Sequence, residues 1–197
     1  MMVNPGNSFI GLLITRNRQR RELHLSQPHY IETMLEKFNM TDCNPRNVPA
    51  DPNGRITKLM SPADDKEEML MINTPYEEAV GSLLYASITT RPVICYAVSQ
   101  VAQFSHNPGP LHWEAVKRIF AYLKGTINHG ILFVQDKTGL IAYADADYAG
   151  DTDTRRSTTG YILTLNNGPI AWCSRRQKST TLSTTEAEYV AACETTK

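Results

Sequence analysis

The most informative residues for the fold of this chain are Tyr143-Ala144-Asp145-Ala146-Asp147. It alternates in the way of a β-strand, whose side chains point to opposite faces in turn. Asp145 and Asp147 should therefore share one face at the exposed end of a strand. In the surrounding sequence, the same alternation predicts an antiparallel meander made of residues 131–134, 140–145, 160–165 and 170–174.

A second acidic stretch, Leu182-Ser183-Thr184-Thr185-Glu186-Ala187-Glu188-Tyr189, begins a predicted helix after that meander. Ser183 followed by Glu186 is a capping box, in which each side chain pairs with a backbone N–H at the helix start. At about 100° per residue, Glu186 and Glu188 lie roughly 200° apart, so only one can face the sheet. Because the cap uses Glu186, we expect Glu188 to point toward the strand ends, where either strand aspartate could be its partner. Such a pair is suited to Mg²⁺ beside a phosphodiester.

The composition is that of an ordinary globular protein. The chain has 197 residues, of which 41% are hydrophobic, enough for one large or two small domains. Twenty basic residues balance twenty acidic ones, so any contact with a polyanion must come from local clusters. The four cysteines have no CxxC spacing, which favours free thiols in a reducing compartment over disulfides or a zinc site: Cys43, Cys95, Cys173 and Cys193.

No targeting or membrane segment is evident. The sequence contains no run of roughly eighteen apolar residues and no apolar signal core, so neither a membrane span nor secretion is predicted. We therefore expect an intracellular protein, and the sequence does not distinguish cytoplasm from nucleus.

The first two thirds of the chain divide at a proline-rich segment. Residues 9–14 and 22–26 alternate as the strands of a hairpin, and residues 28–38 repeat apolar side chains at helical spacing. Residues 43–75 contain five prolines and an acidic run, which favours an irregular linker. Beyond the linker, three short amphipathic helices are predicted at residues 76–87, 92–104 and 111–123.

Four motifs follow one another in the last third: Asp145-Ala146-Asp147-Tyr148-Ala149-Gly150-Asp151, Arg156-Ser157-Thr158-Thr159-Gly160-Tyr161, Ala171-Trp172-Cys173-Ser174-Arg175-Arg176-Gln177 and residues 182–189. In this order they strongly resemble the ribonuclease H region of copia-type LTR-retrotransposon polyproteins. Upstream motifs resemble the segment that follows the polymerase active site of the same polyproteins: Phe9-Ile10-Gly11-Leu12, Leu25-Ser26-Gln27, Thr90-Arg91-Pro92 and the helix from His112 to Thr126. The resemblance covers nearly the whole chain.

The resemblance implies an α/β fold. A truncated ribonuclease H-like mixed sheet would be preceded by a helical thumb or connection and by a β-hairpin from the polymerase palm. Residues 1–42 would end the reverse transcriptase palm, residues 43–75 form the linker, residues 76–128 the thumb or connection, and residues 129–197 the N-terminal half of the ribonuclease H-like domain. The parent copies RNA into DNA and hydrolyses the RNA of RNA–DNA hybrids, so the chain would be a fragment of that enzyme.

Carried over residue by residue, the resemblance makes Asp145 and Glu188 catalytic metal ligands and Asp147 a further metal-binding residue. The implied cofactor is Mg²⁺, or Mn²⁺ in its place, held weakly by so few ligands. The later acidic ligands of the family and its polymerase Tyr-x-Asp-Asp motif have no counterpart in this sequence, which leaves open whether the chain is an enzyme by itself. The implied partners are an RNA–DNA hybrid or other nucleic acid and the rest of the Pol polyprotein, with no membrane.

Basic residues near the last helix are a candidate nucleic-acid contact. Arg175, Arg176 and Lys178, expected in the loop before that helix, could bind phosphates or could be solvated surface. Two other functions stay open. One is a non-catalytic remnant or a co-opted nucleic-acid-binding module. The other is a nucleotide-sugar enzyme using Asp145-Ala146-Asp147 as its metal motif, although no glycine-rich phosphate loop accompanies it.

Overall fold

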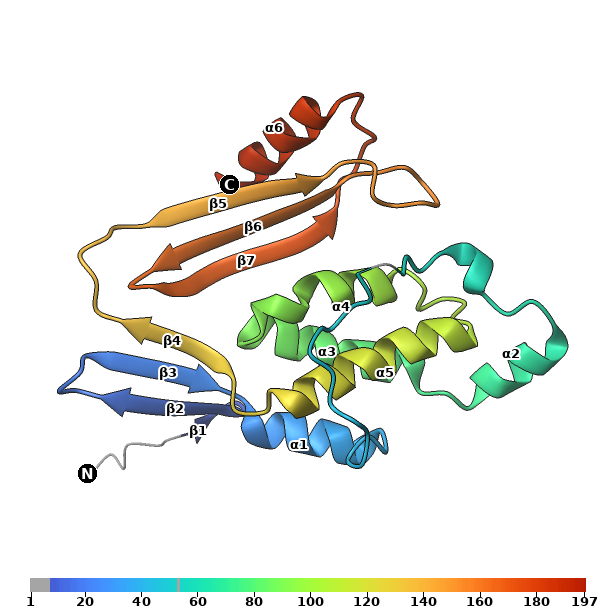
Figure 1. Ribbon diagram of the computed structural model, residues 1–197, viewed down its shortest axis with the longest axis horizontal. Coiled ribbons are helices and arrows are strands. Elements are labelled where there is room, and N and C mark those ends of the chain that lie inside the picture. The colour runs from blue at the N-terminus through green and yellow to red at the C-terminus, as the bar shows by residue number, and fades with distance from the viewer. Residues whose placement is uncertain (1–7, 53) are drawn as a thin grey trace.

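The computed structural model describes residues 8–52 and 54–197. These residues form six α-helices, two 3-10 helices and seven strands, arranged as two antiparallel sheets beside a group of helices (Figure 1). The first sheet has the strand order β1-β2-β3-β4 and the second the order β5-β6-β7. The expectation of an α/β chain is confirmed. Every described strand pair is antiparallel, however, so these strands do not form the predicted mixed sheet.

The first sheet joins the N-terminal hairpin to a strand from much later in the chain. β2 (Leu12–Asn17) and β3 (Glu22–Ser26) form a hairpin, as predicted, and β1 (Ser8–Phe9) pairs with β2. The predicted bounds of the first strand, residues 9–14, are wrong, because Ile10 and Gly11 adopt positive φ angles and turn the chain between β1 and β2. The sequence predicts β4 (Gly130–Val134) in the later meander, but β4 pairs with β3 instead. Gly130 permits this close pairing, because a Cβ there would collide with a backbone oxygen of β3.

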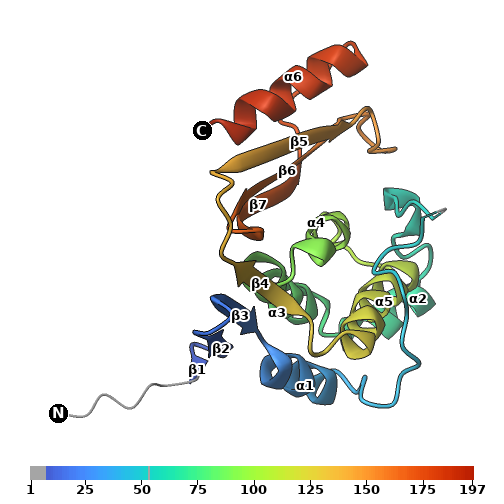
Figure 2. The same ribbon diagram turned by 60° about the vertical axis from the view of Figure 1, so that its left-hand side comes forward.

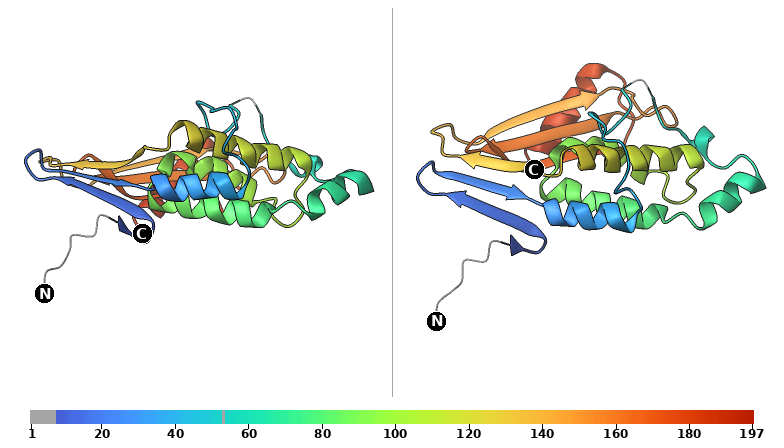
Figure 3. Two further views of the ribbon diagram at one scale, coloured as in Figure 1. Left: turned by 90° about the horizontal axis from the view of Figure 1, so that it is seen from below. Right: turned by 60° about the horizontal axis from the view of Figure 1, so that its bottom comes forward.

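One hydrophobic core joins the first helix to the later ones. α1 (Pro28–Lys37) contacts α5 (Pro110–Gly125), which also contacts α3 (Tyr76–Thr89), and the three lie side by side in Figure 3. The helix predicted at residues 92–104 is divided into η2 (Pro92–Ile94) and α4 (Cys95–Ala102). The fully buried side chains of this core include Ile31, Leu83, Val98, Ile119, Phe120 and Leu123.

The proline-rich segment is more ordered than the sequence predicts. It contains η1 (Lys58–Met60) and α2 (Asp65–Ile72), which coincides with the acidic run. The run forms a helix because the Asp64 side chain accepts a hydrogen bond from the N–H of Glu67 at 2.8 Å, and further acids occupy the positive end of the helix dipole. None of the α2 residues is buried, so this helix contributes little to the core.

The second sheet is the predicted meander without its first strand. β5 (Ile141–Asp147), β6 (Thr158–Leu165) and β7 (Gly168–Arg176) pair in sequence order, and α6 (Thr184–Thr195) packs on β5 and β6. The two asparagines between β6 and β7 adopt positive φ angles of 51° and 60°, as tight hairpin turns require. Figure 2 shows this sheet between α6 on one side and α4 on the other.

Two polar contacts fix the second sheet on the helices. The indole N–H of Trp172 donates to the backbone oxygen of Ser87 in α3 at 2.8 Å, and Arg176 donates to the amide oxygen of Gln103 at 2.8 Å. The assignment of these parts to polymerase and ribonuclease H domains remains a prediction. None of the described helices combines the length and apolarity needed to cross a membrane.

Candidate functional site

Asp145 and Asp147 lie near the end of β5, on the face of the second sheet that is turned toward the helices. Asp147 is opposite Thr158 in β6, and Thr158 is opposite Arg176 in β7. Residues opposite each other in neighbouring strands share a face, and Arg176 contacts Gln103 at the end of α4. Alternation along β5 places Asp145 on this same face, and both aspartates are exposed.

The Asp147 carboxylate acts electrostatically on the phenol of Tyr96 in α4. Burial raises the pKa of the Tyr96 phenol, the Asp147 carboxylate raises it further, and the Arg55 guanidinium lowers it. Gly150 packs so closely on Asp147 that a Cβ in its place would collide with the carboxylate. Asp147 therefore packs against the loop that follows β5, on the face of the sheet turned toward α4.

α6 covers the opposite face of the same sheet. Gln177 donates to the hydroxyl of Thr159 at 3.1 Å and to the backbone oxygen of Ala187 at 3.0 Å. Arg175, which is opposite Thr159, forms an ion pair with Glu194 of α6. Because Thr159 and Arg175 alternate with the residues that face α4, α6 lies on the face away from the two β5 aspartates.

Glu188 is exposed on the flank of α6. Ala187 has no exposed surface and faces the sheet, so Glu188 is turned by about 100° from that direction. The predicted cap is confirmed in its first half, since the Ser183 hydroxyl accepts from the N–H of Glu186 at 3.1 Å. The Glu186 carboxylate accepts from the N–H of Leu182 at 2.6 Å, one residue before the expected donor. Glu186 is thus used by the cap, and Glu188 is left to solvent.

The described residues do not fit a complete two-metal centre. No group of three or more histidine, cysteine, aspartate or glutamate side chains in residues 8–52 and 54–197 could hold a metal ion. Asp145 and Asp147 come from one face of the sheet, whereas Glu188 comes from the helix on the other. The pairing of Asp145 with Glu188 remains a prediction, and no metal-dependent step is derived from these residues.

The three basic residues proposed to contact phosphate do not form one surface. Arg175 and Arg176 lie within β7 rather than in the loop, and as consecutive strand residues they point to opposite faces. Arg175 is ion-paired with Glu194, and Arg176 with Asp151 at 2.7 Å. Lys178 alone is in the loop, where it is exposed.

Asp151 is a residue that sequence reasoning missed. Burial opposes its ionisation, but hydrogen bonds from Arg176 and Thr154 outweigh that effect and lower the pKa of the carboxyl. Its neighbour Asp153 accepts from the N–H of Lys58 at 2.8 Å. These contacts join the loop after β5 to both β7 and the proline-rich segment. The sequence feature that could have indicated Asp151 is its place at the acidic end of the motif at residues 145–151.

Similarity to known proteins extends over almost the whole chain. The chain is 47% identical over 195 residues to the retrovirus-related Pol polyprotein from transposon TNT 1-94 of Nicotiana tabacum. This alignment covers 99% of the chain and 15% of the polyprotein. The chain is 43% identical over 187 residues to the Pol polyprotein from transposon RE1 of Arabidopsis thaliana, covering 92% of the chain and 12% of the polyprotein.

A shorter relative is covered more completely. The chain is 35% identical over 192 residues to an uncharacterized mitochondrial protein of Arabidopsis thaliana, covering 95% of the chain and 74% of that protein. No family model and no solved structure matches the chain. The chain spans less than a fifth of the Pol polyproteins that it matches, yet nearly all of it aligns with them. It therefore belongs to the copia-type retrotransposon Pol polyprotein family.

Proposed function

We propose that this chain is the Pol segment that runs from the end of the reverse transcriptase palm, through a helical thumb or connection, into the first half of the ribonuclease H domain. The order of its motifs supports this assignment, and so does the order of its elements. A hairpin and helices come first, followed by a three-stranded meander with a helix on one face. The parent activity would be RNA-directed DNA synthesis together with metal-dependent hydrolysis of RNA in RNA–DNA hybrids.

By itself the chain should not hydrolyse a hybrid. The observation that carries this conclusion is the placement of the β5 aspartates and of α6 on opposite faces of the second sheet. Hydrolysis with two metal ions requires ligands that stabilise both the attacking and the leaving oxygen, and the described carboxylates do not provide such a set. Mg²⁺ or Mn²⁺ would accordingly bind only weakly near Asp145 and Asp147.

A cleavage assay tests this proposal. The purified chain is incubated with a labelled RNA–DNA hybrid and Mg²⁺, beside the variant Asp145→Asn and the control Asp42→Asn, which changes an exposed aspartate outside the second sheet. No cleavage above background is expected from any of the three proteins. Robust cleavage by the parent and by Asp42→Asn, lost in Asp145→Asn, would show that the chain holds a working site.

The alternative is a non-catalytic, nucleic-acid-binding module. The observation that favours it is the mitochondrial relative, because the region matched by this chain makes up 74% of that protein. This region can therefore form most of a protein by itself. Hybrid binding would then be weak, independent of sequence and sensitive to salt, since contacts to the backbone do not read bases.

The salt dependence of hybrid binding shows whether the chain keeps a nucleic-acid-binding surface or only shares its sequence with proteins that have one. Lys178→Ala should reduce the slope of log K against log salt by about one unit. Arg175→Ala should reduce it less, because Arg175 is ion-paired with Glu194. If no binding is detected at about 50 mM salt, where backbone contacts are strong, the chain has no nucleic-acid partner of its own.

A further inference from the structure

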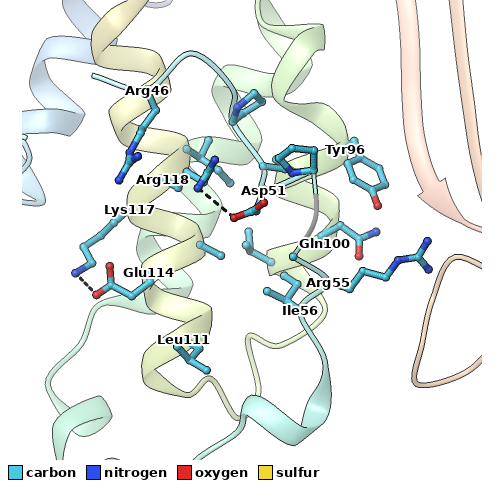
Figure 4. Close-up of a pocket in the computed structure, with 18 of the residues that line it drawn as sticks. Arg46, Asp51, Arg55, Ile56, Tyr96, Gln100, Leu111, Glu114, Lys117 and Arg118 are labelled. Carbon is cyan, nitrogen blue, oxygen red and sulfur yellow. Dashed lines mark ion pairs between the residues drawn. The ribbon is translucent and has the colours of Figure 1, made fainter. Parts of the chain in front are cut away.

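Outside the predicted site, a cavity lies between the proline-rich segment and the helices (Figure 4). Its volume is about 790 Å³, and its walls come from residues 40–52 and 54–60, from α4 and α5, and from the loop at residues 150–153. Ligand sites of proteins have volumes of about 300–1,000 Å³. None of the three predicted metal ligands Asp145, Asp147 and Glu188 lines it, although the Asp147 carboxylate acts electrostatically on Tyr96 in its wall.

One wall of the cavity carries two guanidinium groups. Arg118 of α5 lies with Nη1 3.5 Å from the Asp51 carboxylate, while its Nε is buried and has no hydrogen-bond partner in the described structure. Arg46 is held beside α5 because its backbone N–H donates to the oxygen of Ala121 at 3.2 Å. Its side chain is exposed, and it forms no ion pair with any of the described residues. Because Nε is buried, the part of the Arg118 side chain that stays 26% exposed is what an anion in the cavity could contact.

The other charged groups of the cavity are already engaged. Lys117 is paired with Glu114, and Arg55 donates to the backbone oxygen of Gly150 at 2.6 Å. Among the acids of the far wall, Asp151 is paired with Arg176 and Asp153 accepts from a backbone N–H. Arg46 and Arg118 are therefore the cations best able to meet a new anion, and Arg118 would share its charge between that anion and Asp51.

The remaining walls suit a planar ring. Tyr96 is 44% exposed and lines the cavity together with the amide of Gln100 (Figure 4). Ile56 of the proline-rich segment and Leu111 of α5 add apolar surface. An aromatic face with an amide nearby can stack a nucleobase and hydrogen-bond its edge.

The geometry points to a mononucleotide site, with the phosphate on Arg118 and Arg46 and the base against Tyr96. A phosphate ester is favoured over a carboxylate, because the N–H donors of two guanidinium groups outnumber the two acceptor oxygens of a carboxylate. The three terminal oxygens of a phosphate ester can accept hydrogen bonds from both guanidinium groups. The volume of the cavity accommodates a nucleoside with its phosphate.

Isothermal titration calorimetry with adenosine 5′-monophosphate tests this assignment on the full chain. Binding is expected, with weaker binding of adenosine, which lacks the phosphate, and of ribose 5-phosphate, which lacks the base. Arg118→Met and Arg46→Met should each weaken binding of the monophosphate by about tenfold or more, the loss typical of a charged hydrogen bond. Tyr96→Leu should weaken binding of adenosine and leave binding of ribose 5-phosphate unchanged.

Two controls keep the test decisive. Arg18→Met, in the exposed turn between β2 and β3, should bind as the parent does, and circular dichroism should show that each variant is folded. Arg46 is exposed, so its variant remains informative if Arg118→Met unfolds. Absence of binding to the parent at millimolar nucleotide would overturn the assignment, as would unchanged binding by folded Arg46→Met and Tyr96→Leu.

Discussion

Replacing Arg91 with alanine should strongly destabilise the chain. Arg91 is 2% exposed, and its Nη1 donates to the backbone oxygens of Thr126 at 2.7 Å and of His129 at 3.3 Å. Its Nη2 donates to the Thr126 hydroxyl, and its guanidinium carbon lies 5.9 Å from the centre of the Tyr122 ring. These contacts fix the connection between α5 and β4, where the helical core meets the first sheet.

The magnitude follows from what alanine leaves behind. Two backbone acceptors lose a charged donor, and a buried polar group without a partner costs about 1–3 kcal/mol. The emptied volume adds a cavity penalty, since large-to-alanine changes in cores cost about 2–5 kcal/mol. Burial lowers the pKa of the Arg91 guanidinium, because removing the charge from water costs desolvation free energy. Alanine avoids that desolvation, which offsets part of the loss. We expect a net loss of about 3–5 kcal/mol in the free energy of unfolding.

Urea unfolding followed by circular dichroism measures this loss as a lower midpoint at an unchanged slope. Arg91→Lys keeps the charge but not the forked donors, so it should fall between alanine and the parent. Arg18→Ala, at an exposed position, should stay within about 0.5 kcal/mol. A loss below about 1 kcal/mol for Arg91→Ala would refute the view that this arginine holds the two parts together.

Three further changes probe other parts of the fold. Gly109→Ala should lower stability by about 1–3 kcal/mol, because the new Cβ would collide with a backbone oxygen of η1. Gly81→Ala, in the middle of α3 with open space around the new methyl group, should instead raise stability by about 0.5–1 kcal/mol. Thermal unfolding of the two variants and the parent measures both effects. His112 is neutral with Nδ1 accepting from a backbone N–H, and burial lowers the pKa of its ring. Since the unfolded chain binds the proton first, stability should be full above pH about 6.5 and fall below it, and His112→Gln should flatten the pH profile measured in urea. Trp172→Phe removes the indole donor to α3 and should reduce stability by about 1 kcal/mol; an unchanged midpoint would mean that the second sheet does not depend on this contact.

The local patterns of the sequence predicted most of the elements. The hairpin of β2 and β3, the helices α1, α3 and α5, and the Ser183 cap all follow from periodicity or from residue pairs only a few positions apart. Pairing between distant strands was not available from such patterns. Nothing local to residues 130–134 indicates that they pair with β3 rather than with β5, because both partners offer an alternating strand.

The candidate site was predicted only in part, for a similar reason. Alternation correctly puts Asp145 and Asp147 on one face of β5. It does not predict which face of the sheet α6, much later in the chain, will cover. That choice is made by contacts between distant residues, such as Gln177 with the backbone of Ala187 and Arg175 with Glu194.

The choice of face nevertheless has a physical cause in the motif itself. The alanines of β5 alternate with its aspartates, and Ala146 is opposite Thr159, which contacts α6 through Gln177. A helix can pack closely on a strand only where side chains are small, and α6 brings Ala187 and Ala191, both without exposed surface, to this contact. A carboxylate in place of Ala146 would lie under α6, where burying it without a partner costs several kcal/mol.

The packing of α6 on the alanines therefore leaves the aspartates facing the other way. Because β5 is the last strand on its side of the described sheet, Glu188 can approach Asp145 only around that open edge, not across the sheet. Glu188 lies about 100° around the helix from Ala187, and it is exposed rather than directed into the sheet. The Ala-Asp alternation thus gives both a stable helix–sheet contact and a pair of solvent-facing carboxylates, and the same geometry explains why these residues alone do not close a metal site.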